Sequence, residues 1–309
     1  MGAALQTFFL RSLSSLVLWG VCFAAMYWHY GPVLWALVAF LVLGGLAEFF
    51  SMLRHGGIPH FPRTGLLLGG ALLAAAIGGA VFHGHEAAFS ASAAVLSVAV
   101  PWVVVRQIVR TGYGGQGVDT GLVPSEGAAL LAPLTGIGTT VLGLVYVAFL
   151  GASTVGLLYL SPADAGGHLT SHHYLLYLVV VTKISDLGAY VTGSLLGRHP
   201  MIPRVSPKKT WEGFAGALVH STVASVLLVK WLPEELARLG TPGTAAVVGA
   251  VLGLVAVLGD LGESVLKRAT GVKDSGGFLP GIGGALDLID SLLFTGPLLY
   301  LYLRFVPVL

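Results

Sequence analysis

The sequence predicts an all-α polytopic membrane protein, and three observations support that prediction. Hydrophobic residues make up 55% of the 309-residue chain and charged residues only 10%, whereas about a quarter of a typical soluble domain is charged. The apolar residues form continuous segments long enough for a helix to cross about 30 Å of hydrocarbon. The period-two alternation of an outer-membrane β-barrel is absent, so a helical bundle is favoured.

About nine membrane-spanning helices are expected, each over a continuously apolar segment. In chain order the expected spans are Ser12–Tyr27, Val33–Phe50, Gly65–Phe82, Ala88–Val105, Thr135–Leu158, Tyr174–Leu195, Gly213–Leu232, Ala245–Leu266 and Ala285–Leu303. The first span is expected to be retained, because Met1–Leu10 lacks the basic region of a cleavable signal peptide. The fifth is the least defined: residues 126–160 fit either one tilted helix or a helix followed by a re-entrant segment. Residues 1–110 form an N-terminal group of transmembrane helices, and residues 111–309 form a C-terminal catalytic region.

The basic residues predict the orientation of the chain. If the N-terminus is cytoplasmic, the cytoplasmic side receives twelve of the sixteen Lys and Arg residues, and the opposite side keeps only Lys230, Arg238 and Arg304. Such a bias is the positive-inside pattern. The twelve are Arg11, Arg54, Arg63, Arg106, Arg110, Arg198, Arg204, Lys208, Lys209, Lys267, Arg268 and Lys273. A bacterial inner membrane is the expected location, although an organelle membrane would give the same pattern.

The same topology brings the intramembrane acids to the cytoplasmic side. The eighth span carries Asp260, Glu263, Ser264 and Lys267 at i, i+3, i+4 and i+7, so these side chains share one helix face. Two further spans carry polar residues at the same level, as does Glu48 at the end of the second span. These are Lys183, Asp186, Tyr190 and Ser194 in the sixth span, and Asp287, Asp290 and Ser291 in the ninth. Ionisable groups inside a membrane are costly and usually functional.

Two kinds of ligand are expected for this cluster. Asp260, Asp287 and Asp290 would repel one another unless a cation lies between them, and hard carboxylate oxygens suit Mg²⁺. The surrounding cations favour a polyanion such as a nucleoside triphosphate; they are Lys208, Lys209, Lys267, Arg268 and Lys273. The glycine-rich turn at 279–284 could bring backbone N–H groups to a phosphate, but glycines also serve close helix packing. Spacing alone leaves open whether Lys183 and Asp186 form only a structural ion pair.

Two long motifs resemble one enzyme family. The first is Ser264-Val-Leu-Lys267-Arg268-Ala-Thr-Gly-Val-Lys273-Asp274-Ser-Gly-Gly-Phe-Leu-Pro280-Gly281-Ile282-Gly283-Gly284-Ala-Leu-Asp287-Leu288-Ile-Asp290. The second runs from Ser185-Asp186 through Gly197-Arg198 to Val205-Ser206-Pro207-Lys208-Lys209-Thr210-Trp211-Glu212-Gly213. Both are similar to the signatures of the phosphatidate cytidylyltransferases, also called CDP-diacylglycerol synthases. The chain departs from that pattern at Ile282, where the family usually has histidine, and at Leu288, where it usually has arginine.

The resemblance implies that CTP and phosphatidate react to give CDP-diacylglycerol and pyrophosphate. It implies a metal centre of Mg²⁺, with K⁺ as a candidate second cation, held by Asp260, Asp287 and Asp290. Asp186, Lys267 and Asp287 would be catalytic. The implied substrate-binding residues are Ser206, Lys208, Lys209, Thr210, Lys267, Arg268, Lys273 and Asp274. The resemblance also suggests a homodimer in the lipid bilayer, and no nucleic acid is expected as a partner.

Two alternatives stay open at this stage. A secondary transporter would use intramembrane acids to couple ions to substrate movement, and would show internal repeats and polar residues near the bilayer midplane. The sequence shows no convincing repeat, and its charges crowd one end of the spans. A cytidylyltransferase acting on another lipid phosphate, such as an isoprenoid ether lipid phosphate or a dolichol-like acceptor, would share every motif named above.

Overall fold

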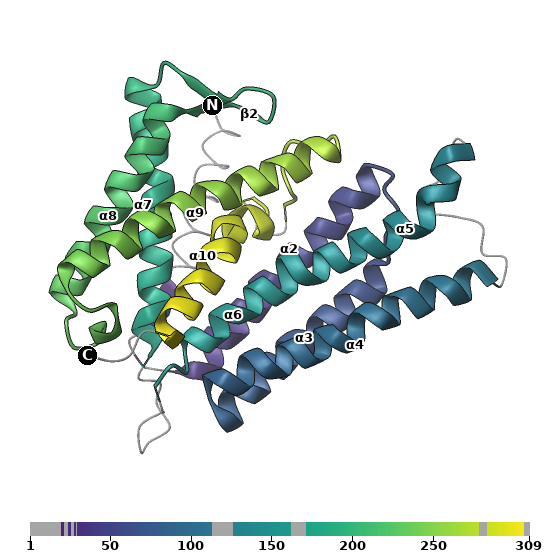
Figure 1. The fold of residues 1–309 in the computed structure, drawn as a ribbon, viewed down its shortest axis with the longest axis horizontal. Helices are drawn as coiled ribbons and strands as arrows, with labels where there is room; N and C mark the ends of the chain where they lie inside the picture. Colours follow the sequence, from purple (N-terminus) through teal and green to yellow (C-terminus); the bar gives the residue numbers. More distant parts are fainter. Residues whose placement is uncertain are drawn as a thin grey trace, which may run out of the picture.

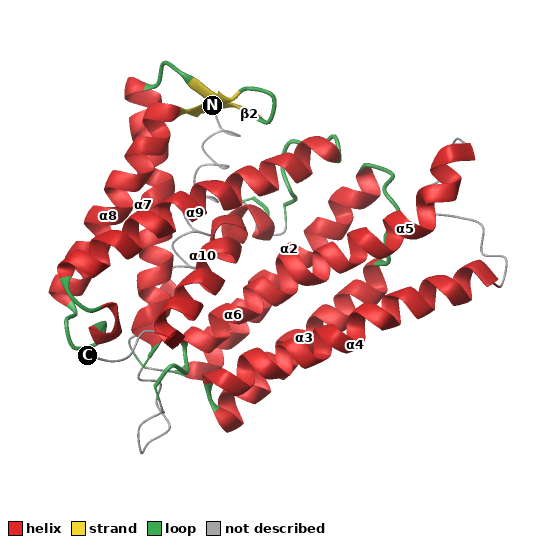
Figure 2. Ribbon diagram, viewed as in Figure 1, coloured by secondary structure: helices red, strands yellow, loops and turns green. Residues whose placement is uncertain are grey.

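The fold is a bundle of long helices with one small hairpin at its edge (Figures 1 and 2). A computed structural model describes residues 20–21, 24–25, 28, 30–112, 126–161, 171–277 and 283–305. Helices α3 and α4 lie side by side at one edge of the bundle, and α7 and α8 at the other (Figure 1). The elements are α2 (Gly31–His55), α3 (Pro62–His83), α4 (His85–Gly112), α5 (Glu126–Gly143), the π-helix η1 (Leu144–Phe149), α6 (Leu150–Leu157), α7 (His172–Leu196), β1 (Pro200–Ile202), β2 (Ser206–Thr210), α8 (Trp211–Trp231), the 3₁₀-helix η2 (Ala237–Leu239), α9 (Pro242–Ala269) and α10 (Ala285–Phe305).

The all-α membrane class is confirmed. Within the described residues, eight helices are long and apolar enough to cross a membrane, and they correspond to the second through ninth predicted spans. The first predicted span, Ser12–Tyr27, falls largely outside the described residues. The fifth span is a single helix over Leu131–Leu157 that runs through α5, η1 and α6. The re-entrant alternative is therefore wrong.

Helix α10 lies at the junction of two hydrophobic clusters. One cluster joins it to α7, α8 and α9 through side chains such as Tyr177, Leu252 and Tyr300. The other joins it to α2, α3 and η1, and includes Phe49 and Ile289. Helices from residues 1–110 and from residues 111–309 thus share one core, and the start of α10 is enclosed by both groups.

The β-hairpin was not anticipated from the sequence. Strands β1 and β2 pair antiparallel, with Pro200 opposite Thr210 and Ile202 opposite Ser206. Strand β2 leads directly into α8, where the Thr210 hydroxyl accepts a 3.1 Å hydrogen bond from the Gly213 N–H and so caps the helix. The Arg268 side chain of α9 donates a 3.1 Å hydrogen bond to the Val205 carbonyl, which ties the hairpin to the end of α9.

Candidate active site

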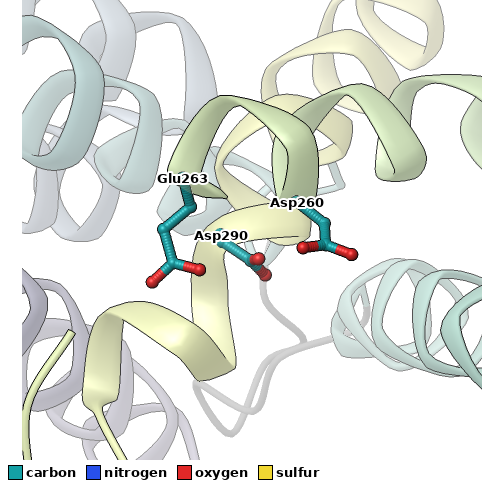
Figure 3. Close-up of side chains that lie close together, drawn as sticks. All are labelled: Asp260, Glu263 and Asp290. Carbon is teal, nitrogen blue, oxygen red and sulfur yellow. The ribbon is translucent and has the colours of Figure 1, made fainter. Parts of the chain in front are cut away.

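Three carboxylates from two neighbouring helices converge beside the start of α10 (Figure 3). Asp260 and Glu263 lie on α9, and Asp290 approaches them from α10. One oxygen of each lies within 4.8 Å of the other two. Glu263 and Asp290 are almost completely buried, at 1% and 5% exposure, while Asp260 is partly exposed. The cluster therefore has an enclosed side and an open side.

Local sequence explains why these helices can meet so closely. The spacing of three residues puts Asp260 and Glu263 on one face of α9. Gly259 lies directly against α10: a Cβ atom there would be 2.8 Å from the Asp290 carbonyl oxygen and 3.0 Å from the Ser291 Cα. Any larger residue at position 259 would separate the two helices, because real Cβ atoms do not approach backbone that closely.

The three carboxylates are only partly compensated. Lys209 of β2 is 2.7 Å from Asp260, and Lys267 donates to Glu263 Oε2 at 2.7 Å. Asp290 accepts from the Ser291 hydroxyl at 3.2 Å. The second Glu263 oxygen, Oε1, is buried and has no hydrogen-bond partner within the described part of the chain. Like charges this close favour a proton or a cation between them, and an oxygen-only set of this kind fits a hard divalent ion such as Mg²⁺.

Asp287, predicted as a metal ligand, lies outside this group of three. Its Oδ1 accepts from Lys267 at 2.8 Å, and its Oδ2 accepts from the Gly284 N–H at 3.2 Å. Because Asp287 is three residues beyond Gly284, the second contact has the geometry of a capping box at the start of α10. Lys267 therefore bridges Glu263 and Asp287, and Glu263 completes the triad in the place predicted for Asp287.

Glu48 stabilises the same helix start from across the bundle. It is 6% exposed, and its Oε2 accepts from the Leu286 N–H at 2.9 Å and from the Ser275 hydroxyl at 3.5 Å. A carboxylate at this position interacts favourably with the positive end of the helix dipole. A Cβ on Gly276 or Gly284 would meet the Glu48 carboxylate, so the chain on both sides of the turn packs directly on this side chain.

Lys183 and Asp186 form the ion pair that their spacing allows, with an N–O distance of 3.2 Å. Asp186 Oδ1 also accepts from the Ser291 hydroxyl at 3.4 Å. Ser291 therefore bridges Asp186 on α7 and Asp290, the residue before it on α10. Hydrogen bonds thus connect α7 to α10, and Asp290 in turn lies next to the two acids of α9.

A polar cleft opens beside the triad. It has a volume of about 390 Å³ and lies between α7, β2, α8 and α9. Asp186 and Asp260 line it together with Lys208, Lys209 and Thr210 of β2. The aromatic rings of Tyr190 and Phe214 also contribute to its wall. Cations, acids and flat apolar groups in one open cleft suit a charged ligand that also carries an aromatic base.

The remaining predicted substrate-binding residues are less closely gathered. Arg268, Lys273 and Asp274 are exposed at and after the end of α9, and Ser206 is half-buried at the start of β2. The hydroxyl of Thr210 is already engaged as the α8 cap. Most of the glycine-rich turn, at 278–282, lies outside the described residues.

Sequence reasoning assigned no role to two buried side chains beside the site. The sequence puts Glu263 on the polar face of its helix, and its spacing of three residues from Asp260 is the signal that makes it a further candidate metal ligand. Tyr146 carried no such signal. It is 7% exposed on the π-helix η1, and its hydroxyl has no hydrogen-bond partner within the described residues. Its ring packs edge-on against Phe294 of α10, with 5.9 Å between ring centroids. Segments of π-helix are frequent at functional sites.

Comparison with known proteins points to one family. The sequence profile of the cytidylyltransferase family matches residues 9–306. A phosphatidate cytidylyltransferase of Mycobacterium bovis is 32% identical over 281 residues, which is 89% of this chain and 82% of that protein. A second, from Mycobacterium tuberculosis, is also 32% identical over 281 residues and is covered to 76%. A third, from Staphylococcus saprophyticus, is 38% identical over 160 residues, which is 52% of this chain and 57% of that protein. The chain belongs to the cytidylyltransferase family.

Proposed function

We propose that the protein is a phosphatidate cytidylyltransferase that transfers CMP from CTP to phosphatidate. The observation that carries the proposal is the convergence of three carboxylates, two of them buried, in the triad of Asp260, Glu263 and Asp290. It lies at the wall of a polar cleft that also holds Lys208 and Lys209. A cation site beside lysine side chains suits a nucleoside triphosphate. The relatives named above carry the same activity in their names.

The reaction needs no nucleophile from the protein. An oxygen of the phosphatidate phosphate attacks the α-phosphorus of CTP, and the bond from that phosphorus to the bridging oxygen breaks. CDP-diacylglycerol forms and pyrophosphate leaves with the electron pair. Such transfers depend on positioning and charge neutralisation. Lys209 and Lys267 would neutralise phosphate oxygens, and Lys208, which lines the cleft, would assist them.

The triad fits Mg²⁺, because Glu263 Oε1 is buried without a hydrogen-bond partner among the described residues and the three acids each have an oxygen within 4.8 Å of the other two. Asp260, Glu263 and Asp290 would hold the ion, which when bound lowers the cost of bringing phosphate charges together. Asp287 orients Lys267 from its capping position. Asp186, already paired with Lys183, is the candidate ligand for a second cation such as K⁺.

We infer the orientation from the charges at the two ends of the helices. Five of the sixteen Lys and Arg residues lie on the hairpin and at the end of α9, and Lys230, Arg238 and Arg304 lie at the opposite end. We therefore place the end with the hairpin in the cytoplasm, where CTP is found. The N-terminus would lie on the same side. A bacterial inner membrane suits this arrangement, and a homodimer is proposed on the family resemblance alone.

The test is an assay of the purified protein with labelled CTP, Mg²⁺ and a panel of lipid phosphates in mixed micelles. Release of pyrophosphate and formation of labelled CDP-diacylglycerol with phosphatidate are expected. Turnover only with a different lipid phosphate would show that the protein is a cytidylyltransferase whose acceptor is that lipid and not phosphatidate. Substrate uptake into vesicles without CTP would overturn the proposal in favour of a transporter.

A further inference from the structure

An apolar pocket lies along α7 on the N-terminal side of the residues that line the polar cleft. It has a volume of about 100 Å³ and is lined by α2, α6, α7 and α10. Its wall is built from aliphatic side chains such as Leu41, Val179 and Leu292. Lys183 is the one charged residue among those that line it. A charged side chain in an apolar membrane pocket is costly unless it meets an opposite charge.

The pocket and the polar cleft meet at one ion pair. Lys183 lines the pocket, Asp186 lines the cleft, and the two side chains are 3.2 Å apart. Ser291 then connects Asp186 to Asp290 of the triad. A single hydrogen-bonded chain of side chains therefore connects the apolar pocket to the carboxylates of the triad. A molecule with a charged head and an apolar tail could place each part in a matching environment.

The long axis of the pocket runs along the helices. Its lining extends from Leu175 to Lys183 on α7 and from Leu34 to Val42 on α2. Each stretch covers eight residue steps, or about 12 Å at a rise of 1.5 Å per residue. Lys183 lies at the end nearer the triad, and Leu34 and Leu175 are buried at the far end. The space is therefore elongated, apolar at depth and cationic at its mouth.

We propose that this pocket holds one acyl chain of the lipid phosphate, with the Lys183 ammonium against the lipid's phosphate. The inference rests on the proposed function for the identity of the head group. The pocket itself identifies the tail as a single hydrocarbon chain, because the space is small and Lys183 and Thr154 are the only described residues with polar side chains that line it. Leu288 of α10 is one of the aliphatic residues that line the pocket.

The test fills the pocket from two sides. Val179→Phe and Leu41→Phe each place a ring in the space, and Val247→Phe is the matched control because Val247 is 64% exposed on α9, outside the pocket lining. With dioleoyl phosphatidate, kcat/KM is expected to fall at least about tenfold in both pocket variants, since displaced methylenes lose their apolar contacts. With dibutyryl phosphatidate, and for the KM of CTP, all variants are expected to match the unsubstituted protein. Equal losses with both lipids, or no loss with either, would overturn the acyl site.

A second measurement does not depend on turnover. Phosphatidate with a photoreactive group at the end of one chain should label the peptides that hold Leu34 and Leu175. Val179→Phe should abolish that labelling, and Val247→Phe should leave it intact. Labelling without any CMP transfer would reject the proposed reaction and keep the pocket assignment. CMP transfer accompanied by labelling spread equally over the exposed faces of α8 and α9 would support the proposed reaction and reject the pocket assignment.

Discussion

Two groups of carboxylates flank the start of α10, and they differ in how their charge is compensated. Glu48 and Asp287 accept hydrogen bonds from backbone N–H groups, and Asp287 also binds Lys267. The triad of Asp260, Glu263 and Asp290 instead contains a buried oxygen without a partner in the described chain. Satisfied carboxylates hold the backbone in place, whereas under-compensated ones mark where a cation belongs. The predictions below test that distinction.

Removing charge from the triad should have the largest effect. Asp290→Asn deletes a proposed ligand charge while keeping side-chain size, and a cation contributes several kcal/mol to such a transfer, so turnover should fall by about 10³-fold or more. The fold should survive, because the substitution also removes repulsion. CMP transfer and thermal unfolding measure the two effects. Near-normal turnover of Asp290→Asn would show that the triad does not hold a catalytic cation.

Chelation of divalent ions should distinguish the triad from the second group. EDTA should abolish turnover, and added Mg²⁺ should restore it. Mg²⁺ should also raise the Tm of the unsubstituted protein, because an ion that binds only the folded state stabilises it. This rise should vanish in Asp290→Asn and persist in Glu48→Gln. A rise of the same size in both variants would place the ion elsewhere.

Lys267 joins the two groups, so its loss should affect both stability and activity. Lys267→Met leaves Glu263 and Asp287 without their shared cation, and breaking such a buried pair costs about 3 kcal/mol. A lower Tm and a loss of turnover are expected together. Lys230→Met, at an exposed position in the last turn of α8, is the control and should change neither. Unchanged stability in the Lys267 variant would show that the bridge is unimportant.

The close approach of α9 and α10 can be tested without touching a charge. Gly259→Ala would force the two helices apart at Asp290, and a displacement of about 1 Å can cost about 10²-fold in rate. Gly262→Ala is the matched control, because its Cβ would lie 3.7 Å from the Phe294 ring in ordinary contact. Equal activity of the two variants would show that this approach does not position the triad.

Glu48 should show the smallest effect, and it should depend on what replaces it. Glu48→Leu removes the acceptor for the Leu286 N–H, and the loss of a supporting side chain of this kind typically costs about 10- to 100-fold in activity. Glu48→Gln keeps an acceptor oxygen and should lose only a few-fold. Steady-state turnover compares them. If Gln were as harmful as Leu, charge rather than positioning would be the role of Glu48.

The sequence was most informative where the evidence is local. Eight spans follow from composition and length, and helical spacing correctly placed Asp260, Glu263 and Lys267 on one face of α9. Spacing could not decide whether Glu263 or Asp287 faces Asp260, because that depends on how α9 and α10 pack. The contact between Glu48 and Leu286 joins residues 238 positions apart, and no local pattern encodes it. The hairpin at 200–210 was missed because its strands are three and five residues long and lack alternation.

The π-helix η1 sets how the second half of the fifth span faces its neighbours. A π turn accommodates one residue more than an α-helix would. If the six residues Leu144–Phe149 were wound as ordinary α-helix instead, everything after them would rotate by about 100° relative to α5. Gly151 now faces Val42 of α2, and Gly156 faces Tyr300 of α10. Both glycines would turn away from these partners, so the span fits its neighbours only because the π turn absorbs the additional residue.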